Sequence, residues 1–87
     1  MADFHYVYVL RCLAEGNFYV GLAQDLRNRF SQHQAGEVPS TKARRPFGLI
    51  YHEGCRNIHD AARREKYLKT AWGKRYLKQR LANYLTG

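Results

Sequence analysis

Four types of side chain with a shared chemical use occur at separate places in this chain. Two strand-like segments carry Tyr8 and Tyr19, one helix-like segment carries Arg29 and His33, and a later one carries Glu65. Hydrolysis of a phosphodiester bond uses such groups. A carboxylate binds a divalent metal ion, an arginine stabilises the charge that grows on the phosphate oxygens, and a tyrosine or histidine orients or deprotonates the attacking water. We therefore treat these side chains as one candidate site.

Glu65 attracts attention because it interrupts an apolar stripe. Ile58, Ala61, Ala62 and Leu68 share one face of a helix by their spacing, and Glu65 falls in the middle of that face. The stripe predicts that the carboxylate points towards the core. A buried, ionised acid is unfavourable unless it is paired or bound to a metal ion. Two interpretations follow: a salt bridge to an Arg or Lys at the helix edge, or a metal ligand.

Arg29 and His33 are four residues apart and share a helix face with Leu26 and Phe30. This spacing predicts that both face inward or into a cleft. The alternatives are a buried ion pair for Arg29 and an ordinary surface position for His33.

The two tyrosines share a face only in some registers of the hairpin that carries them. If Leu13 pairs with Phe18, Cys12 faces Tyr19, and alternation places Tyr8 on the same side. A slip of one residue would separate them. Tyrosines in strands also serve as core or edge packing, which is the alternative interpretation.

The elements that would position these residues can be read from local pattern. Residues 6–10 and 18–22 are rich in β-branched and aromatic residues, and the turn-forming residues 14–17 between them predict a β-hairpin. Asp25 is a suitable N-cap for a helix that stops at Gly36. Residues 37–46 contain both prolines and predict a loop.

The second half predicts one further strand and two helices. Residues 47–52 read as the strand. Asn57, with Asp60 as its reciprocal acid, opens a helix to about Thr70, and Trp72–Tyr84 forms the last helix. The order β-β-α-β-α-α predicts an α+β fold in which helices flank a three-stranded sheet, as a single domain over residues 1–87.

The charge of the chain points to a polyanionic partner. Fifteen Lys and Arg against seven Asp and Glu leave a formal charge of +8. Eight of the fifteen basic residues lie between Arg63 and Arg80, where Glu65 is the only acid. This stretch predicts a phosphate-binding surface. A solvated surface that only aids solubility is the alternative.

The cysteines and the N-terminus point to a reducing compartment. Cys12 and Cys55 are too few for a disulfide framework and lack the spacing of a zinc site. We expect no leader and no membrane span, because the apolar run from Tyr6 stops at Arg11. The expected location is the cytoplasm.

The ordered motifs resemble a known family. Val7-Tyr8, with Tyr6 where the family often has Gly, is followed by Tyr19-Val20-Gly21, and this pair of motifs resembles the two tripeptides of the GIY-YIG nucleases. The resemblance continues through Arg29, His33 and Glu65. The segments 40–46 and 63–66 are most similar to small stand-alone bacterial members related to the N-terminal domain of excinuclease C, which suggests a setting in DNA repair.

The resemblance implies a role for each of these residues. Tyr8 and Tyr19 would line the cleft, and one of them would position or activate water. Arg29 would contact the scissile phosphate, His33 would assist proton transfer, and Glu65 would hold a single Mg²⁺ or Mn²⁺ ion. Contacts to nucleic acid are predicted for Gly21, Lys42, Arg44, Arg45, Lys69, Lys74, Lys78 and Arg80.

The resulting hypothesis is a metal-dependent endonuclease that hydrolyses phosphodiester bonds, with DNA as the favoured substrate. A non-catalytic nucleic-acid-binding module that keeps the same fold is the alternative, but such a binder has no need of a carboxylate that repels phosphate. A structural or protein-interaction domain is the third class, and it leaves Glu65 unexplained. A chain of 87 residues leaves no room for a separate specificity domain, so we expect specificity to be low, to depend on nucleic-acid structure, or to be supplied by a homodimer or a partner protein.

Overall fold

The computed structural model describes residues 4–87, so the first three residues of the predicted domain lie outside the described part. The elements, in chain order, are β1 (His5–Cys12), β2 (Phe18–Ala23), α1 (Leu26–Ala35), η1 (Lys42–Arg44), β3 (Phe47–Cys55), α2 (Ile58–Leu68), α3 (Ala71–Arg80) and α4 (Ala82–Thr86). The predicted α+β class and order of elements are confirmed. The short 3-10 turn η1 and the last helix α4 are additions to the prediction.

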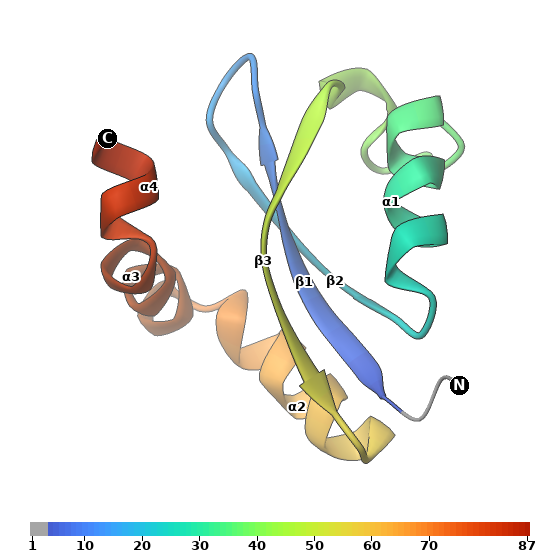
Figure 1. Ribbon diagram of the computed structural model, residues 1–87, viewed down its shortest axis with the longest axis vertical. Helices are drawn as coiled ribbons and strands as arrows, with labels where there is room; N and C mark the ends of the chain where they lie inside the picture. The colour runs from blue at the N-terminus through green and yellow to red at the C-terminus, as the bar shows by residue number, and fades with distance from the viewer. Residues whose placement is uncertain (1–3) are drawn as a thin grey trace.

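The three strands form an antiparallel sheet in the order β2-β1-β3, so β1 is the central strand. Helix α1 covers one face, and α2 and α3 cover the other (Figure 1). A strand covered on both faces has no solvent side, which explains why residues 7–10 of β1 are all buried instead of alternating with exposed ones.

Each face of the sheet has its own core. Towards α2 and α3, the strands place three valines against the helices, and the buried set is Val7, Val9, Val20, Ala61, Leu68 and Leu77. Towards α1, the buried set is Tyr8, Leu10, Cys12 and Phe47, with Leu26 and Phe30 of α1 packed on it. The candidate tyrosine Tyr8 is therefore a core residue of the α1 face.

The hairpin register corrects one prediction and confirms another. Phe18 pairs with Arg11 and not with Leu13, because the ladder closes earlier, where the N–H of Cys12 donates to the carbonyl of Asn17 at 2.8 Å. The shift is two residues, and an even shift keeps every side chain on its face. Tyr19 is opposite Leu10. Tyr8 and Tyr19 thus lie on the same face, as predicted.

The predicted helix starts at Asp25 and Asn57 are confirmed. The carboxylate of Asp25 accepts from the N–H of Asn28 at 3.0 Å, and the Asn57 side chain accepts from two N–H groups of the first turn of α2. Gly36 ends α1 in the left-handed conformation at φ 77°. Asp60 departs from its predicted role as reciprocal acid, since its carboxylate pairs with Arg63 at 3.3 Å.

Three element ends differ from the predictions. The third strand continues past residue 52 to Cys55, because its residues go on pairing with β1 as far as His5. Helix α2 ends at Leu68 and not near Thr70, whose side chain instead caps α3. The predicted helix 72–84 is divided at Leu81, whose φ of −106° and ψ of 22° leave the helical region.

A polar network fastens α2 to β3. The Arg64 guanidinium donates to both Glu53 carboxylate oxygens, at 2.9 Å from Nε and 2.8 Å from Nη2, and the Tyr51 hydroxyl donates to the same carboxylate at 2.7 Å. Burial raises the pKa of the Glu53 carboxyl, but the bonds from Arg64 and Tyr51 outweigh it and leave that pKa below its usual value. The ring of Tyr76 on α3 lies under the same guanidinium, with its centroid 4.7 Å from Cζ.

Helices α2 and α3 pack closely because Gly73 has no side chain. Gly73 is buried, and a Cβ atom there would clash with the backbone at Tyr67 and Leu68. Backbone cannot move aside as the end of a flexible side chain can. The two helices therefore depend on a glycine at this corner.

We predict that Gly73→Ala destabilises the protein by about 1 to 3 kcal/mol or more, because overpacking forces backbone shifts. Gly48→Ala is the matched control, since a Cβ at Gly48 would meet only flexible side chains, of which the nearest is Leu13 at 3.4 Å. We expect that variant to stay within about 0.5 kcal/mol of the natural sequence. Urea unfolding of the three proteins measures the difference, and equal losses for both variants would contradict the packing argument.

Candidate active site

A buried chain of hydrogen bonds joins β1, α1 and the loop before β3. The Tyr8 hydroxyl lies 2.8 Å from Nε2 of His33, and Nδ1 of the same ring lies 2.8 Å from Oγ1 of Thr41. All three side chains are at most 1% exposed. The prediction that His33 faces inward is confirmed, and the alternative of a surface histidine is wrong.

The donor and acceptor of each hydrogen bond in this series follow from the bond that Thr41 makes. The Thr41 hydroxyl donates to the carbonyl of Val38 at 3.4 Å, so its oxygen is left to accept from Nδ1–H of His33. Nε2 of the same ring then carries a lone pair and accepts from the Tyr8 hydroxyl. His33 is thus oriented to take a proton from Tyr8.

The electrostatics of the site keep both groups neutral at pH 7. Burial lowers the pKa of His33, and the nearby Arg29 charge lowers it further. Burial also raises the pKa of the Tyr8 hydroxyl, and the neighbouring Tyr19 and Glu65 add to the rise, while a hydrogen bond from Arg29 opposes it. Arg29 is therefore the group that favours the ionised form of Tyr8.

Gly21 makes the position of Tyr8 possible. The two residues are cross-strand partners, and a Cβ at Gly21 would clash with Cζ and the hydroxyl of the Tyr8 ring. The ring of Tyr8 thus occupies the space that a side chain would need. Sequence reasoning predicted Gly21 as a point of close approach for nucleic acid. That contact stays a prediction, and the structure shows that packing by Tyr8 alone already requires the glycine.

Tyr19 and Arg29 complete the group on the α1 face. The Tyr19 ring centroid lies 5.1 Å from that of His33 and 6.4 Å from that of Tyr8. Arg29 is half-buried, and its Nη1 donates to the Gln32 side chain at 3.0 Å. The buried ion pair that was the alternative for Arg29 is absent from the salt bridges of residues 4–87. This leaves most of its guanidinium donors available to a ligand.

Glu65 lies at the edge of the buried stripe and not at its centre. Ala61 and Leu68 are fully buried, whereas Ile58 is 41% exposed, so the stripe drawn from sequence was too wide. On a helix, Glu65 lies about 50° to one side of the buried line, and Arg64 lies about 50° to the other. The Glu65 side chain retains 23% exposure, and its Oε2 lies 3.2 Å from Nζ of Lys69.

The donor set around Glu65 suits a hard divalent ion. Among residues 4–87, no group of three or more His, Cys, Asp or Glu side chains is arranged as a metal cage. Mg²⁺ commonly binds through one or two carboxylates, keeps several waters and takes further oxygens from a phosphate. Glu65 fits that pattern as a single, partly exposed carboxylate. Its partner Lys69 is 56% exposed, so the lysine can move aside.

Three of the predicted phosphate contacts converge beyond the β2 edge of the sheet. Arg44, Lys74 and Lys78 line a cavity of about 430 Å³ together with Asn17 of the hairpin turn. An adjoining cavity of about 220 Å³ shares Lys74 with the first and continues to Lys69. The two cavities together form a basic groove lined by Arg44, Lys69, Lys74 and Lys78. Tyr19 lines the second cavity as well, so this groove leads to the candidate site.

The remaining predicted contacts lie elsewhere. Lys42 and Arg45 line a separate cavity of about 460 Å³, and Arg45 donates from Nε to the carbonyl of Lys42 at 2.9 Å. Arg80 is exposed in the last turn of α3 and lines none of the cavities described for residues 4–87. Their contacts to nucleic acid stay predictions.

Sequence reasoning missed two residues that hold the site together. Thr41 orients His33, but it lies in a loop, and spacing alone does not bring a loop threonine to a helix histidine. Gln34 lies within the predicted helix, where its spacing gives no sign of a contact to a strand. Its side-chain amide donates to the carbonyl of Phe47 and accepts from the Phe47 N–H, each at 2.9 Å. This pair of bonds joins α1 to the start of β3.

This arrangement of Tyr, Arg, His and Glu on a β-β-α-β-α-α frame defines a class of protein. Residues 4–78 match the model of the family described as the GIY-YIG catalytic domain. Because the match spans most of the chain, the protein belongs to this nuclease family. The predicted family is therefore confirmed.

Within the family, the chain is similar to proteins known as UPF0213. It is 38% identical over 69 residues to the UPF0213 proteins of Staphylococcus aureus strains N315 and Mu50, an overlap that covers 78% of this chain and 83% of each relative. The solution structure of the UPF0213 protein BH0048 from Bacillus halodurans is 30% identical, with a TM-score of 0.55, and the match covers 87% of this chain and 83% of that one. This likeness supports the fold described above.

The length and apolar character of the helices bear on whether any of them could span a membrane. Among residues 4–87, no helix is both long and apolar enough to cross a bilayer.

We predict that acid destabilises the protein through His33. The pKa of His33 is lower in the folded state than the ordinary value of 6.5, so the unfolded chain binds more protons as the pH falls below about 6.5. The free energy of unfolding should then decrease with falling pH, by at most about 1.4 kcal/mol per pH unit for one group. Urea unfolding between pH 7.5 and 5 measures this slope.

His33→Gln should flatten the slope, because a glutamine binds no proton in this range. His59→Gln is the matched control, because His59 is exposed at the start of α2. If the two variants keep the same slope, His33 is not the group responsible.

Proposed function

We propose that this protein is a metal-dependent endonuclease that hydrolyses phosphodiester bonds in DNA. The observation that carries the proposal is the buried bond from the Tyr8 hydroxyl to Nε2 of His33, with the Arg29 guanidinium beside it. Burial alone requires a hydrogen-bond partner for the Tyr8 hydroxyl, but it does not require a cation beside it. A tyrosine that must lose its proton for part of a reaction needs both.

In this proposal Tyr8 activates the attacking water. Its oxygen takes a proton from the water while its own proton passes to Nε2 of His33. Thr41 holds the His33 ring in the tautomer whose Nε2 is free to accept. Burial raises the pKa of Tyr8, and Arg29 opposes part of that rise because it stabilises the phenolate form. Tyr19 packs against the His33 ring and closes the site on the β2 side.

Arg29 has a second task in the proposed reaction. Its planar guanidinium offers several N–H groups, and after the bonds to Gln32 and Tyr8 others are left for phosphate oxygens. Negative charge grows on those oxygens in the transition state, where a fixed cation stabilises it most. Arg29 would thus act on the phosphate and on Tyr8 together.

Glu65 would hold the metal ion, Mg²⁺ or Mn²⁺. When bound, the ion supplies Lewis-acid stabilisation of the phosphate and the leaving oxygen. Lys69 pairs with the carboxylate, which keeps Glu65 compatible with a polyanionic substrate. The basic groove of Lys69, Lys74, Lys78 and Arg44 would hold the phosphates next to the cleaved one.

We predict that Arg29→Lys loses cleavage by about a hundredfold, although the charge is kept, because an ammonium cannot reproduce the planar fork of donors. Arg63→Lys is the matched control, since Arg63 is exposed and pairs only with Asp60. Single-turnover cleavage of a labelled DNA with Mg²⁺ measures both rates. Near-normal cleavage by Arg29→Lys would return Arg29 to a purely structural role.

We predict that Glu65→Gln abolishes metal-dependent cleavage while the protein stays folded and binds DNA. Loss of a metal ligand removes several kcal/mol of transition-state stabilisation, so the rate should fall by about a hundredfold or more. Stability should change by less than about 1 kcal/mol, because the Glu65–Lys69 pair lies at the surface.

Glu37→Gln is the matched control for this experiment, because Glu37 is an exposed acid after the end of α1. Cleavage assays with a titration of Mg²⁺ and Mn²⁺, thermal melts and DNA binding in EDTA separate the effects. A Glu65→Gln variant that still cuts DNA with the same metal dependence would disprove the assignment. Binding without cleavage by the natural sequence under all these conditions would favour a non-catalytic module.

A further inference from the structure

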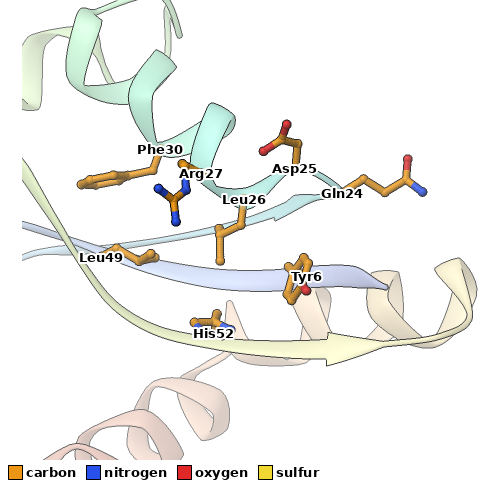
Figure 2. Close-up of a pocket in the computed structure, with 8 residues that line it drawn as sticks. All are labelled: Tyr6, Gln24, Asp25, Leu26, Arg27, Phe30, Leu49 and His52. Atoms are coloured by element: carbon orange, nitrogen blue, oxygen red, sulfur yellow. The ribbon is translucent and has the colours of Figure 1, made fainter. Parts of the chain in front are cut away.

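A cavity of about 570 Å³ shares no lining residue with the basic groove, and none of its residues takes part in the mechanism above. Figure 2 shows it between the first turns of α1 and the strands β1 and β3. Tyr6, Leu49 and His52 form its floor on the strands, while Leu26, Arg27 and Phe30 reach over it from the helix.

The cavity lies beside the candidate active site on the same face of the sheet. His52 on β3 is the cross-strand partner of Tyr8 on β1, so the two residues are immediate neighbours. Tyr6 is two residues before Tyr8 on the same face, about 7 Å along the strand. Two residues of the cavity floor, Tyr6 and His52, are therefore direct neighbours of Tyr8 on the same face of the sheet.

The chemistry of the walls suits a flat aromatic ring. The Tyr6 and His52 rings meet edge to face with their centroids 5.8 Å apart, and the apolar side chains of Phe30 and Leu49 flank them. His52 is exposed, so part of its side chain is accessible to a ligand. Aromatic side chains of this kind stack on nucleobases whatever their identity.

The charge around the cavity favours the same ligand. The Arg27 guanidinium points into it, and among residues 4–87 none of the salt bridges involves this arginine. Asp25, the acid among the lining residues, is turned away in Figure 2, and its carboxylate is engaged with the N–H of Asn28. A cation outside any salt bridge, at an aromatic-lined cavity, matches a base that is attached to a phosphate.

We propose that this cavity binds the nucleobase of a nucleotide that flanks the scissile phosphate, with the base over Tyr6 and His52 and its phosphate near Arg27. The proposal rests on the proposed function, because it places the cleaved strand at Tyr8. It adds a contact to a base, which the basic groove and the catalytic group do not provide.

The test compares binding of a short single-stranded thymidine oligonucleotide with binding of the same sugar-phosphate chain without bases. Fluorescence anisotropy in EDTA prevents cleavage, so the measurement does not depend on the nuclease activity. We expect the natural sequence to bind the chain with bases roughly tenfold more tightly, which is the size of one base-aromatic stack. The phosphate contacts are common to both ligands and cancel in the ratio.

His52→Ala should reduce this ratio towards one and leave the affinity for the base-free chain unchanged. Tyr6→Leu, which keeps an apolar side chain at the half-buried position, should do the same. His59→Ala is the matched control, because it removes an exposed histidine outside the cavity and should keep the full ratio. Methyl signals of Leu49 in NMR spectra should shift with the oligonucleotide and not with the base-free chain.

Three results would overturn the proposal. An equal affinity for both chains would show that no base is bound, and an unchanged ratio in His52→Ala and Tyr6→Leu would place the base elsewhere. Thymidine monophosphate that binds as tightly as the oligonucleotide would identify a site for free nucleotides. Failure of the proposed function is distinguishable: a protein that discriminates between the chains but never cuts DNA with Mg²⁺ keeps the base site and loses the nuclease.

Discussion

The burial of β1 on both faces is the constraint on which the rest of the structure depends. Its side chains alternate between two cores, with valines towards α2 and α3 and Tyr8 towards α1. A tyrosine hydroxyl in such a position must find a partner, since an unpaired buried polar group is unfavourable. His33 provides that partner. Packing therefore forces the tyrosine and the histidine together, and the same contact provides the proton path of the proposed reaction.

The two sides of α2 next to its buried residues have different roles. Arg64, on one side of the buried line of the helix, is fastened to Glu53 and Tyr51. Glu65, on the other side, pairs with the exposed Lys69. A helix held firmly on one flank cannot rotate to bury or withdraw the other. The carboxylate is thereby kept beside Lys69, which lines the basic groove.

Sequence patterns predicted the elements well because the relevant signals are local. Caps at Asp25 and Asn57, the glycine after α1 and the alternation of the strands depend on neighbours in the chain. Tyr8 and Tyr19 lie on one face despite the shift in register, because a shift by an even number of residues keeps each side chain on its face. The depth of Glu65 was predicted less well, since apolar spacing does not reveal that Ile58 at the start of the helix is exposed.

Contacts between distant segments could not be predicted in the same way. Thr41 meets His33 only because a loop turns back over the helix, and His52 meets Tyr8 only through the pairing of β3 with β1.

Gln34 shows how the loop is constrained. Its amide makes both hydrogen bonds that a neighbouring strand residue would make with Phe47, so the segment from the end of α1 to the start of β3 is a ring closed by two bonds. A ring of this kind has few ways to move compared with an open loop of equal length. Thr41 lies within this closed segment, so its contact with His33 is already ordered in the folded protein. The conformational entropy of the segment is therefore lost on folding and not in each reaction cycle.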